Sequence, residues 1–147
     1  KEILDVYYNS DFEVEFKSDN SPLTIADQRA HNVIVEYLSP TEIPILSEEG
    51  KAISYEERRK WNLFWLVDPL DGTKEFVKRN DEFTVNIALI KDNSPIAGVV
   101  YVPVTKTLYW SNIKGSFKAI VDDENETYPK YYLCKCHHSN SDDFAQH

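Results

Sequence analysis

A series of strand-like segments separated by short turns is the feature that most constrains the fold of this chain. Four segments are rich in β-branched and aromatic residues: 83–90 (FTVNIALI), 96–104 (IAGVVYVPV), 107–112 (TLYWSN) and 116–120 (SFKAI). Turn-forming residues lie between them, as in DNSP at 92–95 and at Lys114-Gly115. Strands joined by such short connections pair with their neighbours along the chain. The sequence therefore predicts an antiparallel meander.

The first half of the chain has helical periodicity instead. Apolar residues recur at helical spacing from Thr24 to Leu38, and Ser39-Pro40 ends that run. Residues 1–8 have the pattern of the end of another helix. Shorter elements are expected as well: strands at 11–16, 43–46 and 62–67, a polar helical turn at 55–61 and a short helix at 73–79. Helices first and antiparallel strands afterwards predict an α+β domain, with helices layered on a sheet.

We place one N-terminal, metal-binding α+β domain at residues 1–121 and expect an irregular segment at 122–147, where the strand signal ends. The sequence CKCHH at 134–138 superficially resembles a metal cluster, but it lacks a second ligand pair at zinc-finger spacing. Cys134 and Cys136 are too close together to cross-link a domain. Cysteine usage of this kind favours a reducing, cytoplasmic location; peripheral attachment to the inner membrane is an alternative.

The charge of the chain narrows the class of partner. The formal net charge is −9, which argues against nucleic acid or an anionic membrane surface, since both attract basic patches. No apolar run approaches the roughly 20 residues of a membrane-spanning helix, so we expect no integral membrane segment. A small phosphorylated substrate would be repelled unless bound cations reversed the local field.

Carboxylates cluster where two predicted strands end. Asp68 and Asp71, in WLVDPLDGT at 65–73, follow an apolar strand, and Glu48, in LSEEG at 46–50, follows another. We interpret Pro69 as fixing a turn that holds the two aspartates close together. Neighbouring carboxylates repel each other unless a cation lies between them, and oxygen ligands of this kind suit Mg²⁺. We expect the backbone carbonyl of Leu70 to be exposed inside the turn as a further ligand.

The residues after this turn favour phosphate binding. Gly72 allows a tight reversal of the backbone, and a helix beginning at Thr73 would direct free N–H groups toward the same site. The Thr73 hydroxyl is a candidate for holding an attacking water. In isolation, however, DPLDG is also a common surface turn, and the residues alone leave both interpretations open.

Other polar residues have simpler explanations. An acid in the first turn of a helix, such as Asp27, is favoured by the helix dipole alone. Asp19 is typical of a turn, and we expect His31 to be an exposed helical residue. We expect Lys74, Glu75 and Arg79 to form a solvated helix face, and the tryptophans at 61, 65 and 110 to serve packing.

These motifs together resemble the lithium-sensitive, magnesium-dependent phosphatase superfamily, which includes inositol monophosphatases, fructose-1,6-bisphosphatases and 3′(2′),5′-bisphosphate nucleotidases. The resemblance covers roughly residues 1–120. Four stretches are most similar to the bacterial CysQ-type nucleotidases: KSDNSPLTIADQRAH (17–31), PILSEE (44–49), WLVDPLDGTKEFVKRNDEFTVNIALI (65–90) and PIAGVVYVPV (95–104). The resemblance implies the inositol monophosphatase-like fold.

The resemblance also implies roles for individual residues. Asp27 would orient and deprotonate the nucleophilic water together with Thr73. The implied ligands of two or more Mg²⁺ ions are Glu48, Asp68 (bridging two ions), the Leu70 carbonyl and Asp71. The implied substrate contacts are Glu48, Leu70, Asp71, Gly72 and Thr73. Glu49 is implied to support the ligands from behind.

One part of the family pattern does not occur here. Family members have roughly twice this length, and their second half carries a W-D-x-A-A-G motif whose Asp completes the second metal site. None of the three tryptophans of this chain is followed by Asp. We therefore interpret the chain as an N-terminal portion that lacks the C-terminal α/β part. We expect it to be weakly active or inactive by itself, with exposed apolar surface that leads to aggregation or to homo-oligomerisation.

The leading functional hypothesis is hydrolysis of adenosine 3′,5′-bisphosphate to AMP and phosphate, which removes a by-product of sulfate assimilation. The first alternative is the same chemistry on an inositol phosphate. The second is a non-catalytic remnant that keeps the fold without the second metal ligand.

Overall fold

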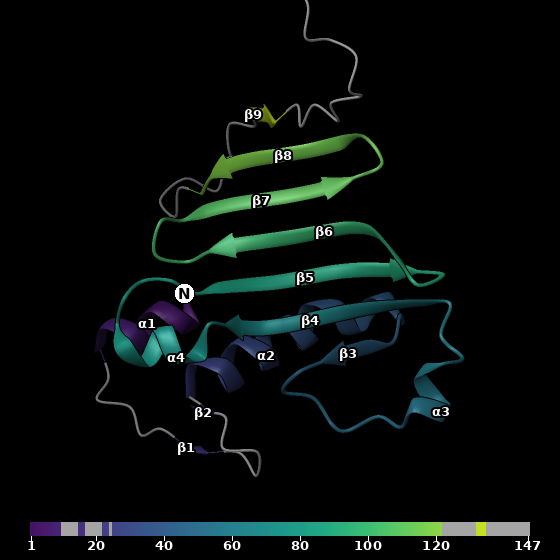
Figure 1. Cartoon of the computed structure of the whole chain (residues 1–147), viewed down its shortest axis with the longest axis horizontal. Helices are drawn as coiled ribbons and strands as arrows, with labels where there is room; N and C mark the ends of the chain where they lie inside the picture. Colours follow the sequence, from purple (N-terminus) through teal and green to yellow (C-terminus); the bar gives the residue numbers. More distant parts are fainter. Residues whose placement is uncertain (10–14, 17–21, 24, 122–131, 135–147) are drawn as a thin grey trace, which may run out of the picture.

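The computed structural model describes residues 1–9, 15–16, 22–23, 25–121 and 132–134 (Figure 1). Within these residues a seven-stranded sheet has the order β3-β4-β5-β6-β7-β8-β9. Strand β3 is parallel to β4, and every other neighbouring pair is antiparallel. The strands are β3 (Ile45–Ser47), β4 (Leu63–Asp71), β5 (Thr84–Lys91), β6 (Ser94–Val102), β7 (Thr107–Asn112), β8 (Gly115–Ile120) and β9 (Tyr132–Cys134).

The remaining elements are short apart from one helix. Strands β1 (Glu15–Phe16) and β2 (Pro22–Leu23) form a separate antiparallel pair. The helices are α1 (Glu2–Asn9), α2 (Ile25–Leu38), the 3₁₀ turn η1 (Ser39–Thr41), α3 (Tyr55–Arg58) and α4 (Thr73–Lys78). The predicted α+β class, with helices layered on a largely antiparallel sheet, is confirmed.

The predicted meander is confirmed as β5 to β8. Its first hairpin turns at Asp92 and Asn93, which both have positive φ angles of 48° and 62°. Two consecutive residues in this left-handed region match the twist of a tight hairpin, and Asp and Asn tolerate it better than most residues. This local chemistry explains why the hairpin could be predicted from the sequence.

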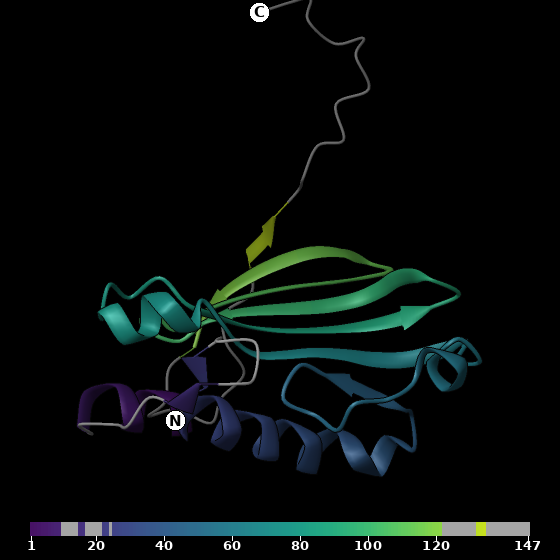
Figure 2. The same cartoon turned by 60° about the horizontal axis from the view of Figure 1, so that its bottom comes forward.

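Helix α2 covers one face of the sheet beside β4, and α1 packs against α2 near the end of that strand. The opposite face of the sheet points toward the viewer in Figure 1 (Figures 1 and 2). Side chains alternate between the two faces of a strand. Ser47 and Val67, which are cross-strand partners, therefore lie on the helix-covered face. Leu66 and Asp68 lie on the open face, where no helix of the described residues crosses the sheet.

The main core lies where the helices meet the end of β4. Its buried members are Ile3, Val6, Tyr7, Ala26, Ala30, Leu70, Phe76 and Phe83. The ring of Tyr7 packs on Phe76 and Phe83, with centroid distances of 5.0 and 4.9 Å. The Tyr7 hydroxyl donates a 2.6 Å hydrogen bond to Asp81. This cluster joins α1 to the segment that follows β4.

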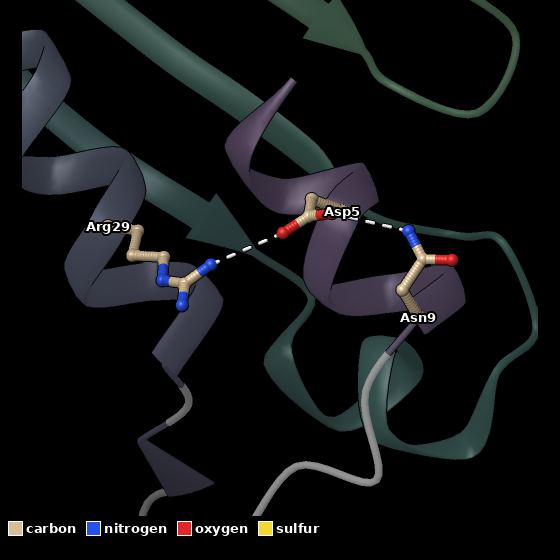
Figure 3. A network of polar contacts seen from close by, with 3 residues as sticks. All are labelled: Asp5, Asn9 and Arg29. Atoms are coloured by element: carbon tan, nitrogen blue, oxygen red, sulfur yellow. Dashed lines mark hydrogen bonds and ion pairs between the residues drawn. The ribbon is translucent and has the colours of Figure 1, made fainter.

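A polar contact on the surface also joins α1 to α2 (Figure 3). Arg29 of α2 donates to Asp5 of α1 at 3.4 Å, and Asn9 donates to the other Asp5 oxygen at 3.2 Å. Because both members of the ion pair are exposed, the contact contributes little stability. Burial of the apolar core therefore dominates the helix packing.

The structure corrects one expectation about β4. The strand does not end before Asp68 but continues to Asp71, with a register irregularity between these two residues. Pro69 has no N–H to donate to a ladder, so the strand bulges there instead of turning away. Asp68 and Asp71 remain paired with β5 on either side of this bulge.

Some predictions lie outside the described residues. These include residues 11–14 of the predicted strand at 11–16, the turn residue Asp19, and most of the CKCHH segment. Within 122–147, the structure describes the short strand β9, which pairs with β8; a domain boundary at 121 remains a prediction. No described helix has both the length and the apolar character needed to cross a membrane.

Phe76→Ala should lower the free energy of unfolding by about 3–5 kcal/mol, because it leaves a cavity at the centre of the aromatic cluster. Chemical denaturation measures this change. Val77→Ala, in the same helix and 37% exposed, is the matched control and should change stability by less than about 0.5 kcal/mol. Equal effects of the two substitutions would contradict this description of the core.

Candidate metal and phosphate site

Strand β4 places two carboxylates at the edge of the open face. Asp68 lies opposite Asn86 of β5, and Asp71 lies opposite Thr84. Two residues of β4 lie between Asp68 and Asp71, whereas one residue of β5 lies between their partners Asn86 and Thr84. Strand β4 therefore contains the extra residue of a β-bulge. Bulges redirect side chains, and this one lets both carboxylates contribute to one site.

Glu48 is brought to the same site by β3. The parallel pairing of β3 with β4 continues into its backbone, where the Glu48 N–H donates to the Val67 carbonyl at 3.1 Å. Glu48 directly follows Ser47, the last residue of β3. Because Ser47 pairs with Val67, Glu48 lies beside Asp68, where the bulge of β4 begins. Glu48 and Asp68 therefore lie close enough for their charges to interact, and a shared metal site at these two strand ends remains a prediction.

Electrostatic crowding is strongest at Asp68. Its pKa is raised from 3.8 to about 6, chiefly because burial disfavours the charged form. The negative charges of Glu48 and Asp71 raise it further, as does that of Glu49, while a hydrogen bond to the Leu70 backbone opposes them. Four carboxylates thus share one local field, and a cation placed among them would relieve their repulsion.

We expected the Leu70 carbonyl to be exposed, but Leu70 is buried in the structure. Leu70 is 2% exposed and belongs to the core, so the prediction of a solvent-exposed carbonyl is wrong. The Leu70 side chain anchors the bulge against α2, and the carbonyl accepts a hydrogen bond from the Thr73 hydroxyl at 3.1 Å. A carbonyl oxygen has a second lone pair, and a metal-ligand role for it remains a prediction.

Gly72 is required by the shape of the backbone after β4. Its φ angle is +90°, and a Cβ atom there would lie 2.8 Å from the Glu82 carbonyl oxygen. A side chain would therefore be strained and would collide with backbone. The glycine allows α4 to begin at Thr73, as predicted. Phosphate contacts of Gly72 and Thr73 remain predictions.

Asp27 lies in the first turn of α2 and is only 4% exposed. Its neighbours Ala26 and Ala30 belong to the same core cluster as Leu70, so this turn packs against the segment that carries the carboxylates. Burial of an acid is costly unless its surroundings compensate. Asp27 is therefore not explained by the helix dipole alone, which would also favour an acid at a solvent-exposed helix start. Its catalytic pairing with Thr73 remains a prediction.

Two contacts at the site were missed by sequence reasoning. Asn86 donates a 3.1 Å hydrogen bond to Asp71 and accepts one from Thr84 at 3.2 Å, which orients the Asp71 carboxylate. The available signal was a polar amide within the apolar strand FTVNIALI. His31 is not exposed as expected but half-buried, with its Nδ1 2.8 Å from the Ser47 hydroxyl.

The chemistry of the donors fits a hard divalent cation. Carboxylate oxygens with a carbonyl nearby are the ligands that Mg²⁺ prefers, and Mg²⁺ also retains several waters. In the described part of the chain, no three His, Cys, Asp or Glu side chains are already arranged to hold a metal ion. Glu48 is exposed, so its side chain is free of the packing that would prevent rotation toward Asp68. The exposed Asp71 carboxylate is oriented by its hydrogen bond from Asn86.

A concave surface extends from these carboxylates across the open face. It has a volume of about 590 Å³, and Asp68 and Asn86 lie at one end. Small residues paired across successive strands form its floor, namely Ala88, Gly98, Ser111 and Ser116. The site therefore opens onto a broad hollow.

The sequence matches a known protein family over nearly its whole length. The model of the "Inositol monophosphatase family" matches residues 1–144. The chain belongs to the inositol monophosphatase family. The match covers the strands and helices that form the carboxylate site.

This chain is similar to two CysQ proteins. The 3′(2′),5′-bisphosphate nucleotidase CysQ of Salmonella typhimurium is 57% identical over 97 residues, covering 65% of this chain and 39% of that protein. The crystal structure of CysQ from Bacteroides thetaiotaomicron has 51% identity and a TM-score of 0.71, covering 84% of this chain and 47% of that one.

A more distant structure has the same fold. The extragenic suppressor protein suhB from Bartonella henselae has 29% identity and a TM-score of 0.69, and the match covers 80% of this chain and 46% of that one. In all three cases, this chain spans less than half the length of the protein that it matches.

The raised pKa of Asp68 has a consequence for stability. An acid whose pKa is higher in the folded state than in the unfolded chain binds its proton more tightly when folded. Ionisation of Asp68 therefore lowers the free energy of unfolding as the pH rises from about 4 through about 6. Asp68→Asn should raise the unfolding temperature in metal-free buffer at about pH 7.5, and the gain should vanish at about pH 4.

Thermal unfolding followed by circular dichroism measures this gain. The control is Glu36→Gln, which removes one exposed negative charge from α2. An Asp68→Asn variant that is no more stable than the unmodified protein at neutral pH would contradict the crowding of carboxylates at Asp68.

Proposed function

We propose that the protein containing this chain hydrolyses the 3′-phosphate of adenosine 3′,5′-bisphosphate, in a Mg²⁺-dependent reaction that yields AMP and phosphate. The observation that carries the proposal is the carboxylate crowding, in which Glu48 and Asp71 add to the raised pKa of Asp68. Similarity to proteins named 3′(2′),5′-bisphosphate nucleotidase supports this substrate class.

In this proposal, Glu48, Asp68 and Asp71 hold the metal ions, with the Leu70 carbonyl as a further ligand. When bound, Mg²⁺ lowers the pKa of a water and stabilises the charge on the leaving oxygen. The Thr73 hydroxyl orients the attacking water, and Asp27 accepts its proton. The water oxygen forms a bond to phosphorus while the bond from phosphorus to the 3′-oxygen breaks. That oxygen takes up a proton from solvent water, and Asp27 later returns its proton to solvent.

The burial of Asp27 supports its role as the base. Asp27 is 4% exposed, so packing holds its carboxylate in place and shields it from bulk water. The first turn of α2 packs beside the bulge through Ala26 and Leu70. Asp27 is therefore carried by a rigid element adjacent to the proposed metal ligands.

The same geometry is compatible with a different phosphate monoester. An inositol phosphate would present the same phosphate group to the metals. The preference for a nucleotide rests on the CysQ relatives. A non-catalytic protein that keeps this fold is the alternative from another class.

We also propose that residues 1–147 alone turn over substrate weakly. A complete second metal site requires the Asp of the W-D-x-A-A-G motif, which is absent from these residues. The broad opening of the hollow beside Asp68 further supports an incomplete substrate pocket.

The test compares phosphate release from adenosine 3′,5′-bisphosphate and from inositol 1-phosphate by the natural gene product that contains these residues. Faster release from the nucleotide, dependence on Mg²⁺ and inhibition by Li⁺ are expected. Asp68→Asn should lower kcat by at least about 100-fold while the protein stays folded, and Glu36→Gln should leave it unchanged.

Four outcomes would count against these proposals. Faster turnover of the inositol phosphate would reassign the substrate, and no turnover of either would favour the non-catalytic alternative. Near-normal activity of Asp68→Asn would remove the metal site from the mechanism. Robust turnover by residues 1–147 alone would refute the proposed dependence on a further metal ligand.

A further inference from the structure

We propose that His31 is a positioning residue, whose hydrogen bond to Ser47 holds the end of β3 and thereby keeps Glu48 at the carboxylate site. This inference rests on the proposed metal site, because Glu48 is one of its ligands. His31 itself touches neither metal nor substrate in the proposal. It acts through Ser47, the residue immediately before Glu48.

The bond joins two elements that carry different parts of the site. His31 lies on α2, four residues after Asp27, so the two side chains lie on the same side of the helix. Its Nδ1 is 2.8 Å from the Ser47 hydroxyl of β3. Both residues are half-buried on the helix-covered face of the sheet, where water competes less well for the bond.

Strand β3 is a short element at the edge of the sheet. It is three residues long and lies at the edge of the sheet, with β4 as its partner. Beyond Ser47, the backbone is held by the Glu48 N–H bond to Val67 and by a turn in which the Gly50 N–H donates to the Ser47 carbonyl at 3.1 Å. The side chain of Ser47 adds a hydrogen bond that ties this end to the helical layer.

A second contact ties the helical layer to β4 at a different point. The Trp65 indole N–H donates to the Thr41 hydroxyl of η1, just after α2, at 3.1 Å. Trp65 precedes Asp68 on β4. One helix with its following turn is thus bonded to both strands whose ends carry the ligands. The His31 bond is the one of these two that lies next to a ligand.

The test separates this role from ordinary packing through hydrogen exchange of single backbone amides. In His31→Ala, the Glu48 amide should exchange about fivefold faster, since one hydrogen bond that restrains it is lost. His31→Asn should restore slow exchange, because Asn places an amide atom near the position of Nδ1. Asn32→Ala removes only an exposed bond to Gln28 on the same helix and is the matched control.

The second measurement is Mn²⁺ binding, followed by the electron paramagnetic resonance signal of the free ion. The dissociation constant should rise about fivefold in His31→Ala and in Ser47→Ala. The double variant should bind as weakly as either single variant, because both remove the same bond. Asn32→Ala should bind Mn²⁺ like the unmodified protein, and His31→Asn should bind nearly as well.

Several results would overturn the inference. If His31→Ala matched Asn32→Ala in both measurements, the bond would have no role at Glu48. Faster Glu48 exchange with unchanged Mn²⁺ affinity would make the bond structural only, and would leave the metal site intact. Absence of Mn²⁺ binding in the unmodified protein would instead overturn the metal site and this role of His31 with it. Ser47→Ala allows the same decision if His31→Ala fails to fold.

Discussion

Repulsion among carboxylates at the end of β4 is the constraint on which the rest of this structure depends. Asp68 is partly buried and feels the charges of Glu48, Glu49 and Asp71, so the folded chain holds together groups that would separate if they were free to do so. Strand pairing on both sides of β4 and the core behind it provide the opposing stabilisation. A cation bound among these carboxylates would offset their repulsion, and the same arrangement would then serve as a binding site.

The end of β4, residues 68–71, contributes both to the core and to the acidic site. Leu70 points into the aromatic and aliphatic cluster, whereas Asp68 and Asp71 on either side of the bulge contribute to the acidic site. Helix α2 contributes Ala26 and Ala30 to that cluster and carries Asp27 beside it. Burial of apolar surface, the dominant favourable term in folding, therefore also fixes the polar groups that we assign to catalysis.

Local patterns in the sequence predicted the elements, but they did not predict contacts between them. The meander followed from alternation and turn residues, and the acidic site followed from the motifs around Asp68 and Glu48. The bonds from His31 to Ser47 and from Asn86 to Asp71 join residues 16 and 15 positions apart, which no local periodicity specifies. Pro69 was interpreted as a turn because a strand that accommodates proline through a bulge has no distinct local signature.

In our proposal, a divalent cation neutralises the carboxylates around Asp68. The most direct test is a carbon-13 NMR titration of the Asp68 carboxyl group with and without saturating Mg²⁺. Without metal the pKa should lie at about 6; with Mg²⁺ it should fall well below that value, because the bound cation favours the charged form. A pKa near 6 that is unchanged by Mg²⁺ would contradict the account.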